Sequence, residues 1–153
     1  MNDAILKVAK IVYSTSVDGV GLRNSLYVSG CPIHCPGCHN KELWDINSGK
    51  PMTVQEVFDA LNEDEFNISI LGGEPLMQYS SVLALCKKIK AETGKTIWMW
   101  SGYTIEEIRE RFPEILEYID VLVDGPFKEE FYEPNLQWRG STNQGVIDIN
   151  TSE

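Results

Sequence analysis

Two hydrophobic periods alternate along this chain of 153 residues. Short apolar or alternating runs, typical of strands, are followed by stretches whose apolar residues recur every three or four positions, typical of helices. The predicted strands are Ile5–Ser14, Asn24–Ser29, Asn67–Leu71, Lys95–Trp100, Asp120–Val123 and Val146–Ile149. Helices are predicted to follow Thr53, to cover roughly Ser80–Thr93 with a stop at Gly94, and to follow Thr104.

Two of these helices carry a capping box at their first turn. Thr53 is followed three residues later by Glu56, and Thr104 by Glu107. In this arrangement the threonine side chain and the glutamate side chain each accept a hydrogen bond from the other's backbone N–H. The sequence therefore marks where both helices begin.

The alternation of strands and helices predicts right-handed βαβ units and an α/β fold. A complete barrel of eight such units usually needs about 200 residues or more. We therefore expect residues 1–153 to form a single domain, an open partial (β/α) barrel of about five units with a mostly parallel sheet.

Four stretches rich in glycine, proline or cysteine directly follow predicted strands. They are Cys31–Cys38, Gly72–Pro75, Ser101–Tyr103 and Asp124–Pro126. Because functional loops of a parallel sheet lie at the carboxyl ends of its strands, we expect all four to meet on one rim.

The cysteines are the strongest chemical signal in the chain. Cys31, Cys35 and Cys38 are spaced C-x3-C-x2-C, close enough to hold one compact centre. Thiolates select zinc or iron–sulfur clusters over hard cations, and thiol redox chemistry is a third possibility. Structural zinc would need a fourth ligand, which His34 or His39 could supply, whereas three cysteines leave one iron of a 4Fe–4S cluster open.

The fourth cysteine has a different setting. Cys86 lies on an apolar helix stripe with Val82, Leu85 and Ile89. Free cysteine is among the most buried residue types, so we expect a core residue rather than a ligand.

The charge balance excludes some partners. Thirteen basic and 23 acidic residues give a formal net charge of −10 and a pI near 4.6. This disfavours nucleic acid and anionic membrane surfaces as partners, and no apolar run approaches the roughly 18 residues of a membrane-spanning helix. We expect a soluble cytoplasmic protein without a signal peptide.

The cysteine spacing followed by Gly72-Gly73-Glu74-Pro75 resembles the radical S-adenosylmethionine (SAM) superfamily. Further segments are similar to the activating enzymes of glycyl-radical enzymes: Asp18–Arg23, Val28–Cys31 and Cys38–Asn40. Others resemble the branch that activates anaerobic ribonucleoside-triphosphate reductase: Trp100–Tyr103, Val123–Gly125 and Trp138–Gln144. The resemblance covers about Asp18 to Gln144.

The resemblance implies a cofactor site. Cys31, Cys35 and Cys38 would hold three irons of a 4Fe–4S cluster, and SAM would chelate the fourth. The residues expected to bind SAM are Gly37, Cys38, His39, Gly72, Gly73, Glu74 and Ser101. Gly72 and Gly73 would accept hydrogen bonds from the SAM ammonium, with a charge-assisted contact from Glu74.

The resemblance also implies the reaction and the partners. Reductive cleavage of SAM would yield a 5′-deoxyadenosyl radical, which takes a hydrogen atom from a glycine of the large subunit of the reductase. A flavodoxin is the expected electron donor.

The alternative functions are an activase of another glycyl-radical enzyme, of the pyruvate formate-lyase type, or a zinc-stapled module without activity. The Trp138–Gln144 tail either docks the reductase, gates the site or caps the C-terminal part of the fold.

Overall fold

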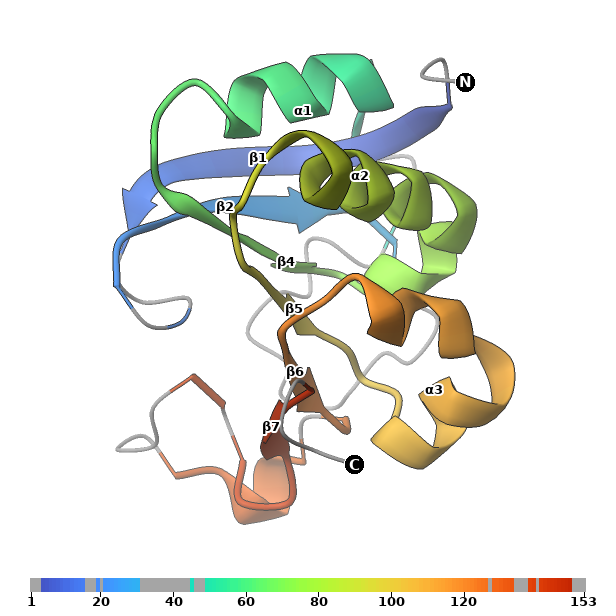
Figure 1. Ribbon diagram of the computed structural model, residues 1–153. Helices are drawn as coiled ribbons and strands as arrows, with labels where there is room; N and C mark the ends of the chain where they lie inside the picture. The colour runs from blue at the N-terminus through green and yellow to red at the C-terminus, as the bar shows by residue number, and fades with distance from the viewer. Residues whose placement is uncertain are drawn as a thin grey trace.

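The described residues form one seven-stranded sheet in the order β3-β1-β2-β4-β5-β6-β7 (Figure 1). This computed structural model describes residues 4–15, 19, 21–30, 45, 49–126, 128–133, 138–139 and 141–149. The strands are β1 (Ile5–Thr15), β2 (Arg23–Val28), β3 (Lys50–Thr53), β4 (Asn67–Gly72), β5 (Ile97–Trp100), β6 (Val121–Asp124) and β7 (Gly145–Asp148).

Three α-helices lie on one face of this sheet (Figure 1). They are α1 (Val54–Leu61), α2 (Tyr79–Glu92) and α3 (Ile105–Arg111). There are also short 3-10 helices: η3 (Pro75–Gln78), η4 (Pro113–Glu117) and η5 (Glu129–Phe131). In the described part of the chain, no helix combines the length and the hydrophobicity needed to cross a membrane.

The centre of the sheet is parallel. Strands β2, β4, β5 and β6 pair in parallel, and α1, α2 and α3 lie in the crossovers between them. The outer strands pair antiparallel: β1 with β2, the edge strand β3 with β1, and the edge strand β7 with β6. The predicted α/β class with a parallel centre is confirmed. A partial barrel of about five units stays a prediction, because the described residues contain three such crossovers.

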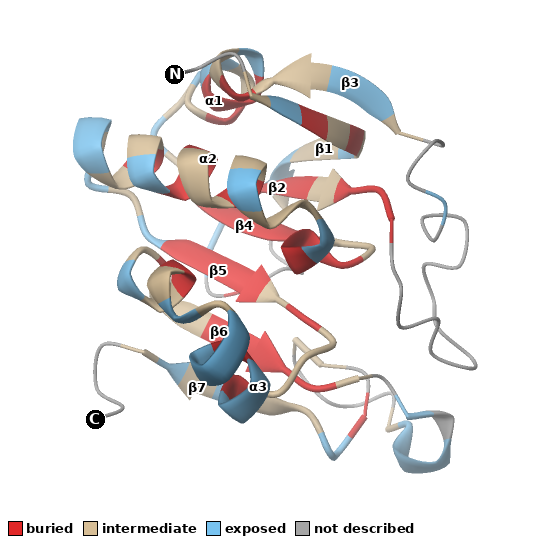
Figure 2. Cartoon of the chain, turned by 90° about the vertical axis from the view of Figure 1, so that its right-hand side faces the viewer, coloured by how far each residue is buried: buried red, intermediate tan, exposed pale blue. Residues whose placement is uncertain are grey.

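The core lies between the helices and the sheet, where the strand residues are buried and the outer helix surfaces are exposed (Figure 2). Alternate strand residues such as Leu26, Ile70 and Met99 face the helices at 0% exposure. Cys86 of α2 joins them, also at 0%, and burial raises the pKa of its thiol to about 12. The prediction that Cys86 is a core residue is confirmed.

Both predicted capping boxes are present, with Thr53 at the start of α1 and Thr104 at the start of α3. Helix α2 ends just before Gly94, close to the predicted stop, but Gly94 lacks the positive φ of a glycine cap. The cap is Thr93, whose backbone N–H and hydroxyl both donate to the Ile89 carbonyl. Strand β3 was not predicted, because Pro51 disfavours a strand except at a sheet edge, which is where β3 lies.

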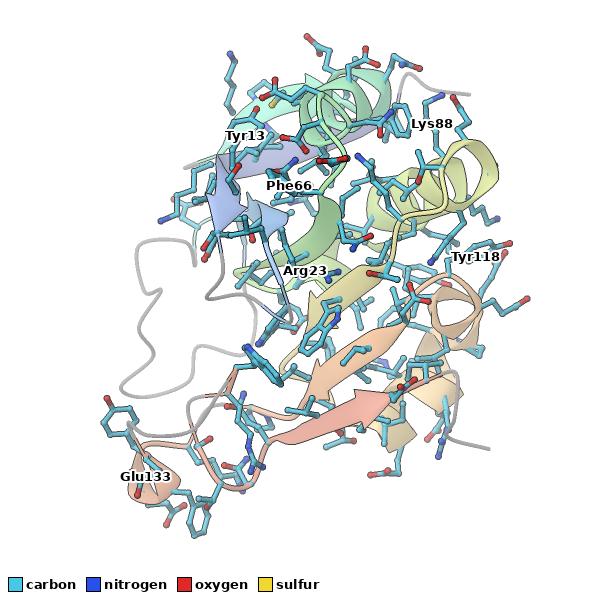
Figure 3. The ribbon with its side chains drawn as sticks, turned by 60° about the vertical axis from the view of Figure 1, so that its left-hand side comes forward. Tyr13, Arg23, Phe66, Lys88, Tyr118 and Glu133 are labelled. Atoms are coloured by element: carbon cyan, nitrogen blue, oxygen red, sulfur yellow. The ribbon has the colours of Figure 1, made fainter. Side chains whose placement is uncertain are left out.

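On the opposite face, Arg23 joins the amino ends of three strands. Its Nε donates to Ser69 Oγ at 2.8 Å and its Nη2 to the carbonyls of Ile68 at 2.7 Å and Thr96 at 3.0 Å. The guanidinium also lies 5.6 Å from the Trp98 ring centroid. Figure 3 shows Arg23 against the strands, and burial lowers its pKa to about 10. This network fixes the sheet at the end opposite the predicted rim.

Candidate functional site

The Gly72–Pro75, Ser101–Tyr103 and Asp124–Pro126 loops meet, together with Gly30 after β2, at the carboxyl edge of the parallel sheet, as predicted for these three loops. The fourth predicted stretch, Cys31–Cys38, lies outside the described residues. Hydrogen bonds between neighbouring segments run along this edge from Gly30 to Gly125. We call this connected edge the rim. It is the only part of the described fold that brings the predicted motif segments together.

The Gly72–Pro75 loop lies tightly against the end of β2. Gly72 has φ +115, and a Cβ there would be 2.5 Å from the Val28 nitrogen, so the position requires glycine. Beyond it, the Gly73 N–H donates to the Val28 carbonyl at 2.8 Å and the Glu74 N–H to the Gly30 carbonyl at 2.7 Å. The loop is thus bonded to the residues that immediately precede Cys31.

The Glu74 side chain connects two loops of the rim. Its Oε1 accepts from the Gly102 N–H at 2.6 Å, and its Oε2 accepts from Ser101 Oγ at 2.9 Å and from the Leu76 N–H at 3.0 Å. The residue is 1% exposed. Its carboxylate therefore holds the β4 and β5 loops together, while the expected contact with a SAM ammonium stays a prediction.

Burial and hydrogen bonding act on this carboxylate in opposite directions. Desolvation is the larger effect and raises the pKa of Glu74 to about 7, although the three donors favour the charged form. Near neutral pH the group therefore exchanges between two protonation states inside the rim.

Ser101 is positioned in the same way. Its N–H donates to the Val123 carbonyl at 3.0 Å, and its hydroxyl donates to Glu74 and accepts from the Tyr103 N–H at 3.1 Å. The residue is 4% exposed. The structure places Ser101 at the rim, as predicted, and shows that its hydroxyl supports the loop; a role in binding SAM stays a prediction.

The C-terminal tail closes the far end of the rim. Gln144 Nε2 donates to the Gly125 carbonyl at 3.0 Å, and Asn143 Nδ2 to the Pro126 carbonyl at 2.9 Å. Asp124 adds to this by accepting from the Ile105 and Gly145 N–H groups at 2.8 Å and 3.0 Å. The tail thus bonds to the Asp124–Pro126 turn that follows β6.

The predicted cluster ligands Cys31, Cys35 and Cys38 lie outside the described residues, as do Gly37 and His39. Among the residues that the structure does describe, no group of three or more His, Cys, Asp or Glu could hold a metal ion. The described rim nevertheless suits the predicted group. Hydrogen bonds hold Gly30 just after the end of β2, and Cys31, the first of three cysteines whose thiolates can bind iron, follows it in the sequence.

Comparison with known proteins gives the family. Residues 17–147 match the family described as "4Fe-4S single cluster domain". An anaerobic ribonucleoside-triphosphate reductase-activating protein of Escherichia coli K12 is 42% identical over 139 residues, which is 85% of this chain and 90% of the relative. The chain belongs to this family of activating proteins.

Two further activating proteins show how far the family extends. That of Vibrio cholerae is 42% identical over 140 residues, covering 85% of this chain and 90% of the relative. That of Enterobacteria phage T4 is 35% identical over 135 residues, covering 84% and 85%. The resemblance drawn from the motifs is therefore confirmed, and membership of an activating-protein family with a 4Fe–4S domain supports an iron–sulfur cluster in this chain.

The sequence analysis missed one side chain at this activating protein's rim. Gln78, at the end of η3, donates from Nε2 to the Ser29 carbonyl at 3.0 Å. The available signal was its place three residues after Pro75, where a polar side chain follows the apolar pair Leu76-Met77.

Proposed function

We propose that this chain is a radical SAM activase that generates a glycyl radical on anaerobic ribonucleoside-triphosphate reductase. The observation that carries this is the pair of hydrogen bonds from Gly73 and Glu74 to the Val28 and Gly30 carbonyls, in a chain of the activating-protein family. These bonds join the segment expected to bind SAM to the segment that enters the cysteine motif.

Cys31, Cys35 and Cys38 are the proposed ligands of a 4Fe–4S cluster. When bound, the cluster and SAM supply one-electron cleavage of the sulfonium and the radical chemistry at glycine. Gly37, Cys38 and His39 are proposed to lie beside the adenosine part of SAM. The chain's own task is to hold both groups in one orientation and to exclude competing reactions.

The peptide geometry of the Gly72–Pro75 loop supports its role toward the SAM ammonium. In a trans peptide the N–H and the C=O point in opposite directions. Because the Gly73 and Glu74 N–H groups point at β2, the carbonyls of Gly72 and Gly73 point away from it. Two neighbouring carbonyls facing the same way are suitable acceptors for an ammonium group, and Glu74 and Ser101 keep them in place.

We further propose that the sheet belongs to an open partial barrel whose mouth admits the glycine-bearing segment of the reductase large subunit. The name of the relatives supports the reductase as the target. The cytoplasmic location and the flavodoxin donor stay predictions.

The first test is cleavage of SAM. The chain is purified without oxygen, its iron and sulfide are rebuilt, and dithionite is added with SAM. We expect 5′-deoxyadenosine and methionine as products, lost in Cys35→Ala. Cys86→Ala is the matched control, because that thiol is buried in the core and should leave cleavage intact.

The second test is the target. Adding the reductase large subunit should produce a glycyl radical in its electron paramagnetic resonance (EPR) spectrum, while a pyruvate formate-lyase should produce none. A chain whose cluster has been rebuilt but that yields neither 5′-deoxyadenosine nor methionine contradicts the proposed activase. Zinc binding without cluster formation would favour the zinc-stapled module.

A further inference from the structure

The three carbonyls before Cys31 are all held by one segment of the chain. Val28 accepts from the Gly73 N–H at 2.8 Å, and Gly30 accepts from the Glu74 N–H at 2.7 Å. The carbonyl between them, that of Ser29, accepts from Gln78 Nε2 at 3.0 Å. Two of these donors are backbone groups, so the third is the one that depends on the identity of a side chain.

The orientation of the Gln78 amide is determined by its other partners. Its Oε1 accepts from the Lys7 N–H at 2.8 Å, and its Nε2 also donates to the Lys7 carbonyl at 3.0 Å. The oxygen therefore faces a donor and the nitrogen faces two acceptors, which excludes the flipped amide. Gln78 thus ties Ser29 to the backbone of β1 in one arrangement.

Ser29 is also confined from a second side. Its N–H donates to the same Lys7 carbonyl at 3.0 Å, and the residue is 0% exposed. A Cβ at Gly49 would lie 2.4 Å from Ser29 Oγ, so the space beside it is filled. The chain leaving β2 therefore has little freedom to shift while these backbone bonds and the Gln78 bond to the Ser29 carbonyl are in place.

We propose that Gln78 is a positioning residue for the cysteine motif, because it sets where the chain leaves β2 for Cys31. The inference rests on the proposed function and deepens it. Catalytic groups must be held within about 0.5 Å of their working geometry, so a small shift of this segment would misplace the cluster relative to the Gly72–Pro75 loop.

Ser81 provides a matched control for Gln78. It lies in the first turn of α2, and its Oγ donates to the Ile5 carbonyl of β1 at 2.7 Å. Both side chains therefore bond the start of this helical segment to the same strand. Gln78 also donates to the Ser29 carbonyl. Gln78→Ala and Ser81→Ala each lose an anchor to β1, but the first also removes the Nε2 donor to the Ser29 carbonyl.

The test compares rebuilt wild-type chain, Gln78→Ala and Ser81→Ala by SAM titration of the EPR signal of the reduced cluster. Urea unfolding of each chain measures stability separately. We expect Gln78→Ala to weaken the SAM response roughly five- to thirtyfold, since a buried carbonyl loses its donor. Ser81→Ala should stay within about twofold of wild type.

A second variant protects the test against a failure of Gln78→Ala to fold. Gln78→Glu keeps an acceptor for the Lys7 N–H but loses the donors to Ser29 and Lys7, so it should show the same weakened response. If the wild type responds to SAM and the Gln78 variants respond equally well, the positioning role alone is refuted. If the wild type shows no response, the proposed function fails and the inference fails with it.

Discussion

At the scale of single residues, two opposing effects act on the Glu74 carboxylate. It is buried, and all three of its hydrogen-bond partners in the described chain are donors. Donors stabilise the carboxylate, whereas burial stabilises the neutral acid, and burial is the larger effect. One side chain thereby links the geometry of two rim loops to the pH.

This pKa predicts how stability depends on pH. The ordinary pKa is 4.5 and the folded value is about 7, so the folded state retains a proton that the unfolded chain releases between those values. Stability due to Glu74 should therefore fall as the pH rises through this window, by up to about 3 kcal/mol. Urea unfolding at several pH values should show that Glu74→Gln removes this fall.

Glu56→Gln is the control for that measurement. Hydrogen bonds from Thr53 lower the pKa of Glu56, so its contribution is lost as the pH falls, which is the opposite sign. Equal pH profiles for wild type and Glu74→Gln would contradict the raised pKa.

At the scale of elements, the site depends on how β4 ends. Gly72 is the last residue of the strand, pairs with Val28 across the sheet and has the positive φ that turns the chain into the loop. The strand thereby determines both the position and the direction of the next two N–H groups. A loop built in this way is rigid at its first residue.

We expect Gly72→Ala to destabilise the chain by about 3 kcal/mol or more and to abolish the SAM response, because a Cβ would clash with the Val28 backbone. Gly94→Ala is the control, since a Cβ there has no described neighbour within 4 Å and the residue lacks a positive φ. Urea unfolding should find it neutral or stabilised by up to about 1 kcal/mol. Equal effects of both substitutions would contradict this account of the turn.

At the scale of the whole molecule, the C-terminal tail returns to the rim built by the central strands. Asn143 and Gln144 bond the turn after β6, and Trp100 Nε1 donates to the Trp138 carbonyl. Arg139 donates to the Gln144 carbonyl at 2.5 Å. The polar groups of the tail therefore serve the fold, which favours the capping interpretation for Asn143 and Gln144.

Arg139→Ala separates the remaining interpretations of the tail. If the tail also docks the reductase, the variant should cleave SAM normally yet activate the reductase roughly fivefold less, the effect of one lost hydrogen bond. The measurements are 5′-deoxyadenosine formation without partner and glycyl-radical yield with it. Equal losses in both would show that Arg139 only supports the rim.

The sequence by itself determined the class of fold, the starts of two helices and the family. These are local or periodic properties: capping boxes at Thr53 and Thr104, apolar stripes such as that of Cys86, and a cysteine spacing that has few other uses. Each is readable because the residues that make it are close together in the chain. The strand ends could be placed on one rim by a different argument, because the alternation of strands and helices predicts parallel pairing.

Only the tertiary structure decided which side chains work at the rim. Glu74 bonds residues 27 and 28 positions away, and Gln78 bonds Ser29 across 49 positions, so no local pattern records these contacts. The edge position that allows Pro51 in a strand likewise depends on its partner β1. Hydrogen bonds between distant loops exist once the sheet has brought their ends together, and that proximity is a property of the folded chain.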